Sequence, residues 1–288
     1  MISKLNIGLI SFLFIMLILI SYLPNYQPFS PFNNAWDGIS FLYKNSLGLI
    51  TSSSNLNFNG AIIIINPENI PTNTDIKNLK EFLNKGNEVI ITGYGNNVNY
   101  LIKSLGGNIT TYNNTIYDDV FNYKSNSFII ALSNENKLIL FYTSYLKNGY
   151  PLANTSFFSY IKNSSGNSYG PFVVASYETI NNGKLIVIAD PYFFTNYIID
   201  LGNNYNFFLN LTNGKRYYIA TFLQKETPYL YLKEKITLLS SFISQTYMQF
   251  IIISSLFVIS LIFYNISEVS RDKVNISTGI NKIMKEHP

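Results

Sequence analysis

The sequence predicts an α/β fold with a Rossmann-like, mostly parallel sheet, flanked by N- and C-terminal transmembrane helices. AIIIIN (61–66) and EVIIT (88–92) are short continuous apolar runs, which are typical of strands buried on both faces of a sheet. Between them, residues 73–85 repeat apolar side chains at helical spacing, and Gly86 follows as a C-terminal stop. Strand, helix and strand joined by short loops are typical of a parallel sheet with helices on both faces.

Two apolar segments account for a composition that is 47% hydrophobic and only 12% charged. Residues 5–23 carry no charge and would span about 28 Å as a helix, close to the hydrocarbon thickness of a bilayer. We therefore predict a retained anchor over residues 1–23. A cleaved signal peptide is the alternative, although no small-residue cleavage site follows. A second span is predicted at 247–266, with a buried core helix as the alternative. Because the basic tail 267–288 follows it, both termini are expected in the cytoplasm and the centre of the chain outside the plasma membrane.

The centre of the chain is expected to hold one extracytoplasmic domain, over residues 35–226, after an extended linker at 24–34. Residues 143–170 are rich in Ser, Asn and Gly and are expected to form a surface loop. The aromatic side chains of this loop make it a candidate interaction surface. An amphipathic juxtamembrane helix is expected at 227–246. The remaining predicted helices are 35–45, 97–105 and most of 191–211, and the remaining predicted strands are 47–51, 127–132, 137–142, 171–177, 184–190 and 215–223.

Two separated motifs carry a family resemblance. NP (66–67) precedes LKEFLNKG (79–86), and much later GKLIVIADPYFFTN (183–196) precedes NFFLNL (206–211). This order resembles the GldG-like, class I glutamine amidotransferase-like domains of uncharacterised membrane proteins, which are domains of unknown function. The resemblance covers roughly residues 33–222. It implies an amidotransferase-like fold without catalytic activity, in a protein that works beside transport or membrane-assembly components.

The residues that amidotransferases use for catalysis are missing from this chain. Those enzymes place a cysteine on a sharp turn after a strand and pair it with a histidine. The chain has no cysteine, and its one histidine is His287 in the predicted cytoplasmic tail. The equivalent turn is Gly93-Tyr94-Gly95, where Tyr94 is expected to pack as an aromatic side chain, with a substitute nucleophile as the alternative. The sequence therefore predicts no catalytic residue, no metal site and no cofactor. Without a phosphate-binding motif or a basic stripe, nucleic acid is not an expected partner either.

Asp190 is the acid with the most informative position, because it ends a buried strand and precedes a proline. This pattern predicts a helix cap, with ligand contact and catalysis as alternatives. Ligands of open α/β sheets bind beyond the carboxyl ends of the strands, so Asp190, Glu68 and the turn Gly93-Tyr94-Gly95 are expected to line one ligand-binding crevice. Five Asn-x-Ser/Thr triplets in the predicted domain are candidate glycosylation sites, at Asn108, Asn113, Asn154, Asn163 and Asn210.

These features together predict a non-catalytic, membrane-anchored extracytoplasmic domain that binds or scaffolds a protein partner in an envelope or transport-related complex. One alternative is a carboxylate-dependent hydrolase of cell-surface glycan, which would need two acids about 5–10 Å apart in a cleft. A second alternative is a glycan-binding or envelope-anchoring protein, which would present Tyr and Trp side chains as an exposed flat platform. The Asn-, Ile- and Tyr-rich composition favours an archaeal-type envelope.

Overall fold

The computed structural model describes residues 25–225, except 135 and 165, together with positions 228, 231, 232, 235, 236 and 254. Contacts divide the chain into two units, Pro24–Glu226 and a second unit made of Met1–Leu23 and Thr227–Pro288. Apart from the isolated positions just given, the predicted anchor, juxtamembrane helix, second span and tail lie outside the described residues. Among the described residues, no helix combines the length and the apolar character that crossing a membrane requires.

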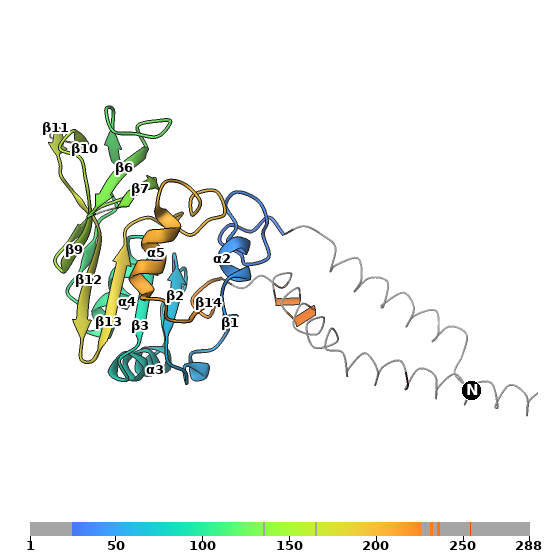
Figure 1. The fold of residues 1–288 in the computed structure, drawn as a ribbon. Coiled ribbons are helices and arrows are strands. Elements are labelled where there is room, and N and C mark those ends of the chain that lie inside the picture. The colour runs from blue at the N-terminus through green and yellow to red at the C-terminus, as the bar shows by residue number, and fades with distance from the viewer. Residues whose placement is uncertain are drawn as a thin grey trace, which may run out of the picture. The chain divides into compact units, whose positions relative to one another are not determined.

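A mixed sheet forms the centre of the unit Pro24–Glu226 (Figure 1). In the described residues it has eleven strands, nine of them in the order β1-β14-β2-β3-β13-β12-β9-β6-β7, while β8 pairs with β12 and β4 pairs with β8. The strands in this order are β1 (Leu49–Ile50), β14 (Tyr217–Ala220), β2 (Ala61–Ile65), β3 (Glu88–Thr92), β13 (Gly183–Ile188), β12 (Val173–Ile180), β9 (Tyr150–Thr155), β6 (Phe128–Ser133) and β7 (Asn136–Phe141), with β8 (Leu146–Lys147) and β4 (Thr110–Thr111).

The prediction of a mostly parallel, Rossmann-like sheet was wrong, whereas the predicted flanking transmembrane helices lie outside the described residues. Four strand pairs, from β1 to β13, are parallel. The other six pairs of this sheet are antiparallel. The difference arises in the second half of the chain, where hairpins replace helical crossovers. Asn181 and Asn182, for example, join β12 directly to β13, and Asn181 has the positive φ (52°) that such a tight turn requires.

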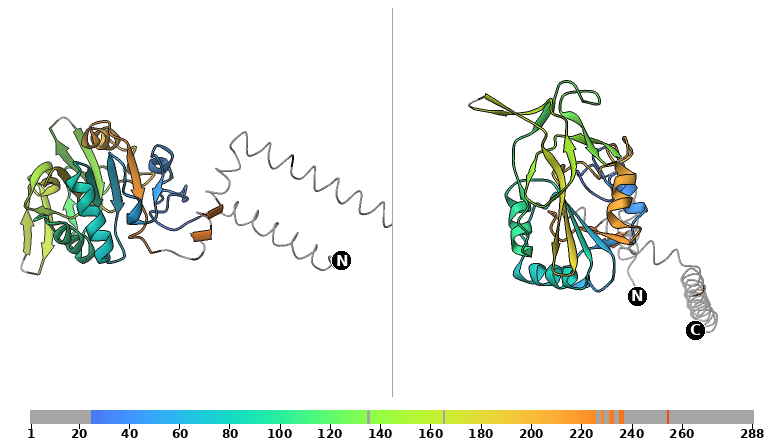
Figure 2. Two further views of the ribbon diagram at one scale, coloured as in Figure 1. Left: turned by 90° about the horizontal axis from the view of Figure 1, so that it is seen from below. Right: turned by 60° about the vertical axis from the view of Figure 1, so that its left-hand side comes forward.

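Residues 143–170 are not a loop. They contain β8, β9 and two further strands, β10 (Ser159–Asn163) and β11 (Gly166–Tyr169). The latter two form a hairpin that joins β5 (Ile116–Asp118) in a separate three-stranded sheet. Figure 2 shows this hairpin projecting from the main sheet. Polar residues dominate these strands because one or both of their faces meet solvent, which is why their sequence has the composition of a loop.

Helices cover both faces of the parallel strands, and alternate residues of each strand supply the two cores. Ile63 and Ile65 of β2 belong to one core, while Ile62 and Ile64 belong to the other. The first core also takes buried side chains of α2 and α5, and the second takes those of α3 and α4. The described helices are α2 (Ser40–Lys44), the 3-10 turn η1 (Ser53–Asn55), α3 (Asn73–Asn84), α4 (Asn96–Leu105) and α5 (Asn204–Thr212).

Two segments near the ends of the unit differ from prediction. The described part of the predicted linker, 25–34, folds as a series of turns, because Asn25, Ser30 and Asn33 are buried and hydrogen-bonded. The predicted helix at 35–45 is shortened to α2. The segment 191–203 forms turns before α5 begins, so the helix expected over most of 191–211 is also shorter.

Candidate binding site

Asp190 lies directly after β13 and is completely buried. Its Oδ2 accepts a hydrogen bond from the backbone N–H of Phe141 (2.8 Å), and its Oδ1 accepts one from Tyr192 (2.7 Å). Burial raises the pKa of Asp190 to about 7, against the opposing effect of the backbone hydrogen bonds from Phe141, Tyr192 and Phe193. Asp190 therefore joins the end of β7 to the turn after β13, and it bonds the start of that turn as a cap would.

The two residues that Asp190 holds by their backbones support an exposed tryptophan. Trp36 stacks on Tyr192, with ring centroids 6.1 Å apart and an interplanar angle of 21°, and meets Phe141 edge-on at 6.4 Å. Trp36 is 53% exposed, and Tyr142, whose ring contacts Phe141 at 4.3 Å, is 43% exposed. We call these four residues, Trp36, Phe141, Tyr142 and Tyr192, the aromatic surface.

The side chain of Asn196 makes several of the hydrogen bonds that hold the loop carrying Trp36. The side-chain amide of Asn196 donates to the carbonyls of Asn33 (3.0 Å) and Ala35 (2.7 Å), and its oxygen accepts from the N–H of Phe41 (2.9 Å). The same loop turns tightly at Gly38, where an added Cβ would lie only 1.9 Å from the carbonyl oxygen of Asn33. The motif residue Asn196 therefore has a structural role, which is to hold Trp36 beside Tyr192.

The turn after β3 lies next to Asp190. Gly93 donates its N–H to Ile188 of β13 (3.0 Å), and Gly95 donates to Thr111 Oγ1 (2.9 Å). Both glycines have positive φ, 109° and 100°. Tyr94, between them, is half-buried, and its pKa is raised mainly by burial and further by the neighbouring Asp190. The structure thus brings Gly93, Tyr94 and Asp190 together, as the parallel pairing of β3 with β13 requires.

Glu68 does not join this group. Its carboxylate accepts a hydrogen bond from the N–H of Lys225 (3.1 Å), and its backbone N–H donates to Leu223 (3.0 Å). The physical reason is the position of β14 beside β2, which places the residues that follow β14 against the loop that follows β2. The expectation that Glu68 shares one crevice with Asp190 is therefore not supported by its contacts.

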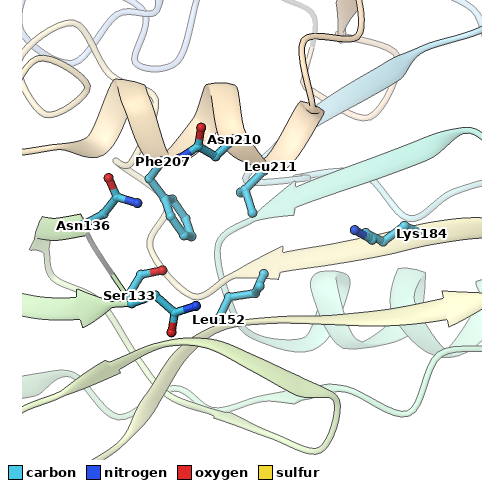
Figure 3. Close-up of a pocket in the computed structure, with 8 residues that line it drawn as sticks. Ser133, Asn136, Leu152, Lys184, Phe207, Asn210 and Leu211 are labelled. Carbon is cyan, nitrogen blue, oxygen red and sulfur yellow. The ribbon is translucent and has the colours of Figure 1, made fainter.

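A cavity of about 310 Å³ lies away from these residues, between the β6–β7 turn, β9, β13 and α5 (Figure 3). Phe207 and Leu152 form its apolar part, and Lys184 and several amides provide polar groups. None of the predicted ligand-binding residues lines it, but the candidate glycosylation site Asn210 does.

The five candidate glycosylation sites are exposed in the structure. Asn108 and Asn113 lie on either side of β4, and Asn154 lies in β9. Asn163 ends β10 at the turn of the projecting hairpin, and Asn210 lies in α5. Surface exposure is what attachment of a glycan requires, so each site is sterically compatible with modification.

The aromatic surface was not found from the sequence. Trp36, the only tryptophan, and Tyr192, which follows the Asp-Pro pair, were available as signals. Nothing in the sequence places these residues together, because Asn196 brings the two loops into contact only in the folded chain.

The sequence of this chain matches one known protein family. A family model described as a domain of unknown function (DUF4350) matches residues 47–212, which is more than half of the chain. The chain belongs to the DUF4350 family. No curated protein matches it.

Solved structures with a similar chain path are distant from this one. The mmIFT52 N-terminal domain is 18% identical with a TM-score of 0.43, and the match covers 57% of this chain and 81% of that one. The exo-beta-1,4-mannosidase Op5Man5 from Opitutaceae bacterium strain TAV5 is 9% identical with a TM-score of 0.28, covering 51% of this chain and 24% of that one. Gan42B, a GH42 beta-galactosidase from G. stearothermophilus, is 12% identical with a TM-score of 0.29, covering 55% and 22%. Because each TM-score is below 0.5, these likenesses support no argument about function.

Proposed function

We propose that this DUF4350 protein is a non-catalytic binding domain at the outer face of the plasma membrane, and that its aromatic surface binds a protein partner in an envelope or transport-related complex. The observation that carries the proposal is the exposure of Trp36 and Tyr142 beside the carboxyl ends of the parallel strands. Tryptophan and tyrosine dominate the binding energy of protein interfaces, since they bury a large area at low conformational cost.

The surroundings of this surface support binding rather than catalysis. Asp190 lies beneath it with no exposed area, and backbone N–H groups occupy both of its oxygens. Glu68 is engaged with Lys225. Neither acid is arranged to meet a glycosidic bond as a carboxylate-dependent hydrolase requires.

The location is inferred from the sequence, since residues 5–23 and 247–266 lie outside the described residues. The exposure of the candidate glycosylation sites is compatible with an extracytoplasmic domain. We also infer from the motifs LKEFLNKG (79–86) and GKLIVIADPYFFTN (183–196) a relationship to GldG-like and amidotransferase-like domains. That relationship concerns the sequence motifs and does not extend to the arrangement of the sheet.

The experiment is capture of the tagged full chain from native membranes, in three forms: wild type, Trp36→Ser and Tyr169→Ser. Tyr169 is 66% exposed on the projecting hairpin, and as a member of the segment 143–170 it serves both as an aromatic control and as a test of that alternative interaction surface. We expect a partner that co-purifies with the wild type and with Tyr169→Ser but not with Trp36→Ser. A partner that all three forms retain equally, or no reproducible partner, would refute the proposal.

Glycan binding is the second candidate, because Trp36 is 53% exposed and is held in place by stacking on Tyr192. Sugar rings pack their apolar faces on such aromatic side chains, as other apolar groups do. If glycan is the ligand, soluble cell-envelope polysaccharide will change the fluorescence of Trp36 in a saturable manner in the wild type and not in Tyr192→Ser. Polysaccharide that leaves the fluorescence unchanged would exclude this candidate.

A further inference from the structure

A second cavity, of about 410 Å³, lies at the amino-terminal ends of the parallel strands, opposite the edge that carries Asp190. Because β14, β2 and β3 run parallel, the residues that precede them meet at one edge of the sheet. This volume falls within the range of small-molecule sites. The cavity is lined by Asn59, Gly60, Lys85, Gly86, Asn87, Gly214, Lys215 and Arg216. We call it the basic cavity.

Three cations line the basic cavity, and one carboxylate lies close to them. Lys215 pairs with Glu88 at 2.9 Å, and the Glu88 side chain is only 4% exposed whereas that of Lys215 is 41% exposed. Lys85 reaches only the amide oxygen of Asn57, at 3.4 Å. The guanidinium of Arg216 makes no hydrogen bond or ion pair with any residue that the structure describes. Three positive charges and one negative charge leave the cavity with a net charge of +2.

Hydrogen bonds hold the chain segments that carry these cations close together. The carbonyl of Arg216 accepts a hydrogen bond from Ala61 (2.9 Å), and Gly60 donates to the buried Asn87 (2.9 Å). An added Cβ at Gly60 would lie 2.3 Å from the Arg216 carbonyl oxygen, so glycine permits the close approach of the two segments. The backbone at the floor of the cavity is therefore fixed, while the side chains of Lys85 and Arg216 are exposed to solvent.

A helix-stabilising role accounts for part of this charge. Lys85 follows α3 and Lys215 follows α5, and cations at such positions offset the partial negative charge of a helix C-terminus. Arg216 directly precedes β14 and is exposed, and it adds a third positive charge beyond the two lysines that follow helices. Arginine binds phosphate oxygens through two parallel hydrogen bonds, and lysine binds them as a point charge.

We propose that the basic cavity binds a phosphate group, carried either by a small soluble molecule or by a phospholipid headgroup. Arg216 and Lys85 contact the phosphate oxygens, and the Glu88–Lys215 pair forms the fixed wall. This site is separate from the aromatic surface, and its ligand is independent of the proposed partner.

The test uses the full chain in a non-ionic detergent and measures binding by isothermal titration calorimetry. The probes are inorganic phosphate, for a soluble ligand, and dihexanoyl phosphatidic acid, for a lipid headgroup, with dihexanoyl phosphatidylcholine as the zwitterionic control. We expect saturable binding of one phosphate group per chain, and the probe that binds more tightly identifies the source. The variant Lys85→Ala/Arg216→Ala should lose at least tenfold in affinity. Lys80→Ala/Lys103→Ala removes two exposed helix lysines and should lose less than twofold.

Circular dichroism without ligand shows whether the double variant is folded. If the double variant is unfolded, the single variant Arg216→Gln is measured instead, and its affinity for the phosphate probe should fall at least threefold. Three results would overturn the proposal: no saturable binding of either phosphate probe, equal binding of phosphatidylcholine, or an equal loss in the control pair, which would indicate a general charge effect. Binding that is unchanged in Arg216→Gln would also overturn it, and would leave the cations with a helix-stabilising role only.

Discussion

The buried carboxyl of Asp190 predicts an unusual dependence of stability on pH. Folding raises its pKa from 3.8 to about 7, so between these values the folded chain retains a proton that the unfolded chain has released. The contribution of Asp190 to the free energy of unfolding is therefore largest below about pH 4 and falls as the pH rises toward 7. Above pH 7 it changes no further. One pKa unit corresponds to about 1.4 kcal/mol, so the free energy of unfolding should fall by roughly 3 kcal/mol between pH 5 and 8.

The variant Asp190→Asn isolates this effect from those of other carboxyls. Asparagine has one acceptor oxygen, so the N–H of either Phe141 or Tyr192 loses its partner. We expect the variant to be roughly 1–3 kcal/mol less stable than the wild type at pH 5, from that lost bond. Because the variant has no proton to lose, the difference should shrink by roughly 3 kcal/mol at pH 8, so the two proteins become equal or exchange their order.

The assay is urea unfolding of the full chain at pH 5, 6, 7 and 8, followed by the fluorescence of Trp36. This residue is the only tryptophan, and it stacks on Tyr192, so its emission reports the segment that Asp190 holds. Asp200→Asn is the control, because it removes an exposed carboxyl that folding does not desolvate. Parallel pH profiles for the wild type and Asp190→Asn would refute the reasoning, and would mean that Asp190 is ionised in the folded chain.

Three further predictions concern other parts of the unit. Asn196→Ala removes four hydrogen bonds, two to the loop of Trp36 and two to the start of α2, and should lower the free energy of unfolding by roughly 2–4 kcal/mol, with a shift in Trp36 emission. An unchanged urea midpoint would contradict the role given to Asn196. Thr72→Ala removes the capping box that Thr72 forms with Asp75 at the start of α3 and should cost about 1 kcal/mol, whereas Thr74→Ala on the same helix should cost less than half as much; equal losses would argue against the cap. Mass spectrometry of peptides from native membranes should find glycans at the candidate sites Asn108, Asn113, Asn154, Asn163 and Asn210. If all of these peptides are unmodified, the result would count against the extracytoplasmic location.

The buried strands could be predicted from the sequence, including β6, β7 and β12 of the antiparallel half, while the exposed strands within residues 143–170 could not. A strand buried on both faces needs apolar residues at every position, as in β2 and β3, and such runs are conspicuous. A strand with an exposed face carries polar residues, and all four residues of β11 are exposed. Its sequence, GNSY, has the composition of a turn, so only the pairing with β10 identifies it as a strand.

One part of the candidate site could also be predicted from the sequence, and another part could not. The neighbourhood of Tyr94 and Asp190 follows from two buried strands that were both predicted and that pair in parallel. The aromatic surface depends on contacts between loops far apart in the sequence, such as those of Asn196 with Asn33 and Ala35, and no periodicity encodes them. Glu68 was misplaced because the position of β14 in the sheet cannot be derived from the order of the strands along the chain.

Site-specific photocrosslinking in native membranes tests the central claim, that the aromatic surface binds a protein partner, most directly. A photoreactive phenylalanine analogue is placed at Tyr142 in the aromatic surface and, as the control, at Tyr150, which is 65% exposed on β9. We expect one discrete crosslinked protein from position 142 that is absent from position 150 and that disappears when Trp36→Ser is added. No crosslink from position 142, or the same crosslinked protein from both positions, would contradict it.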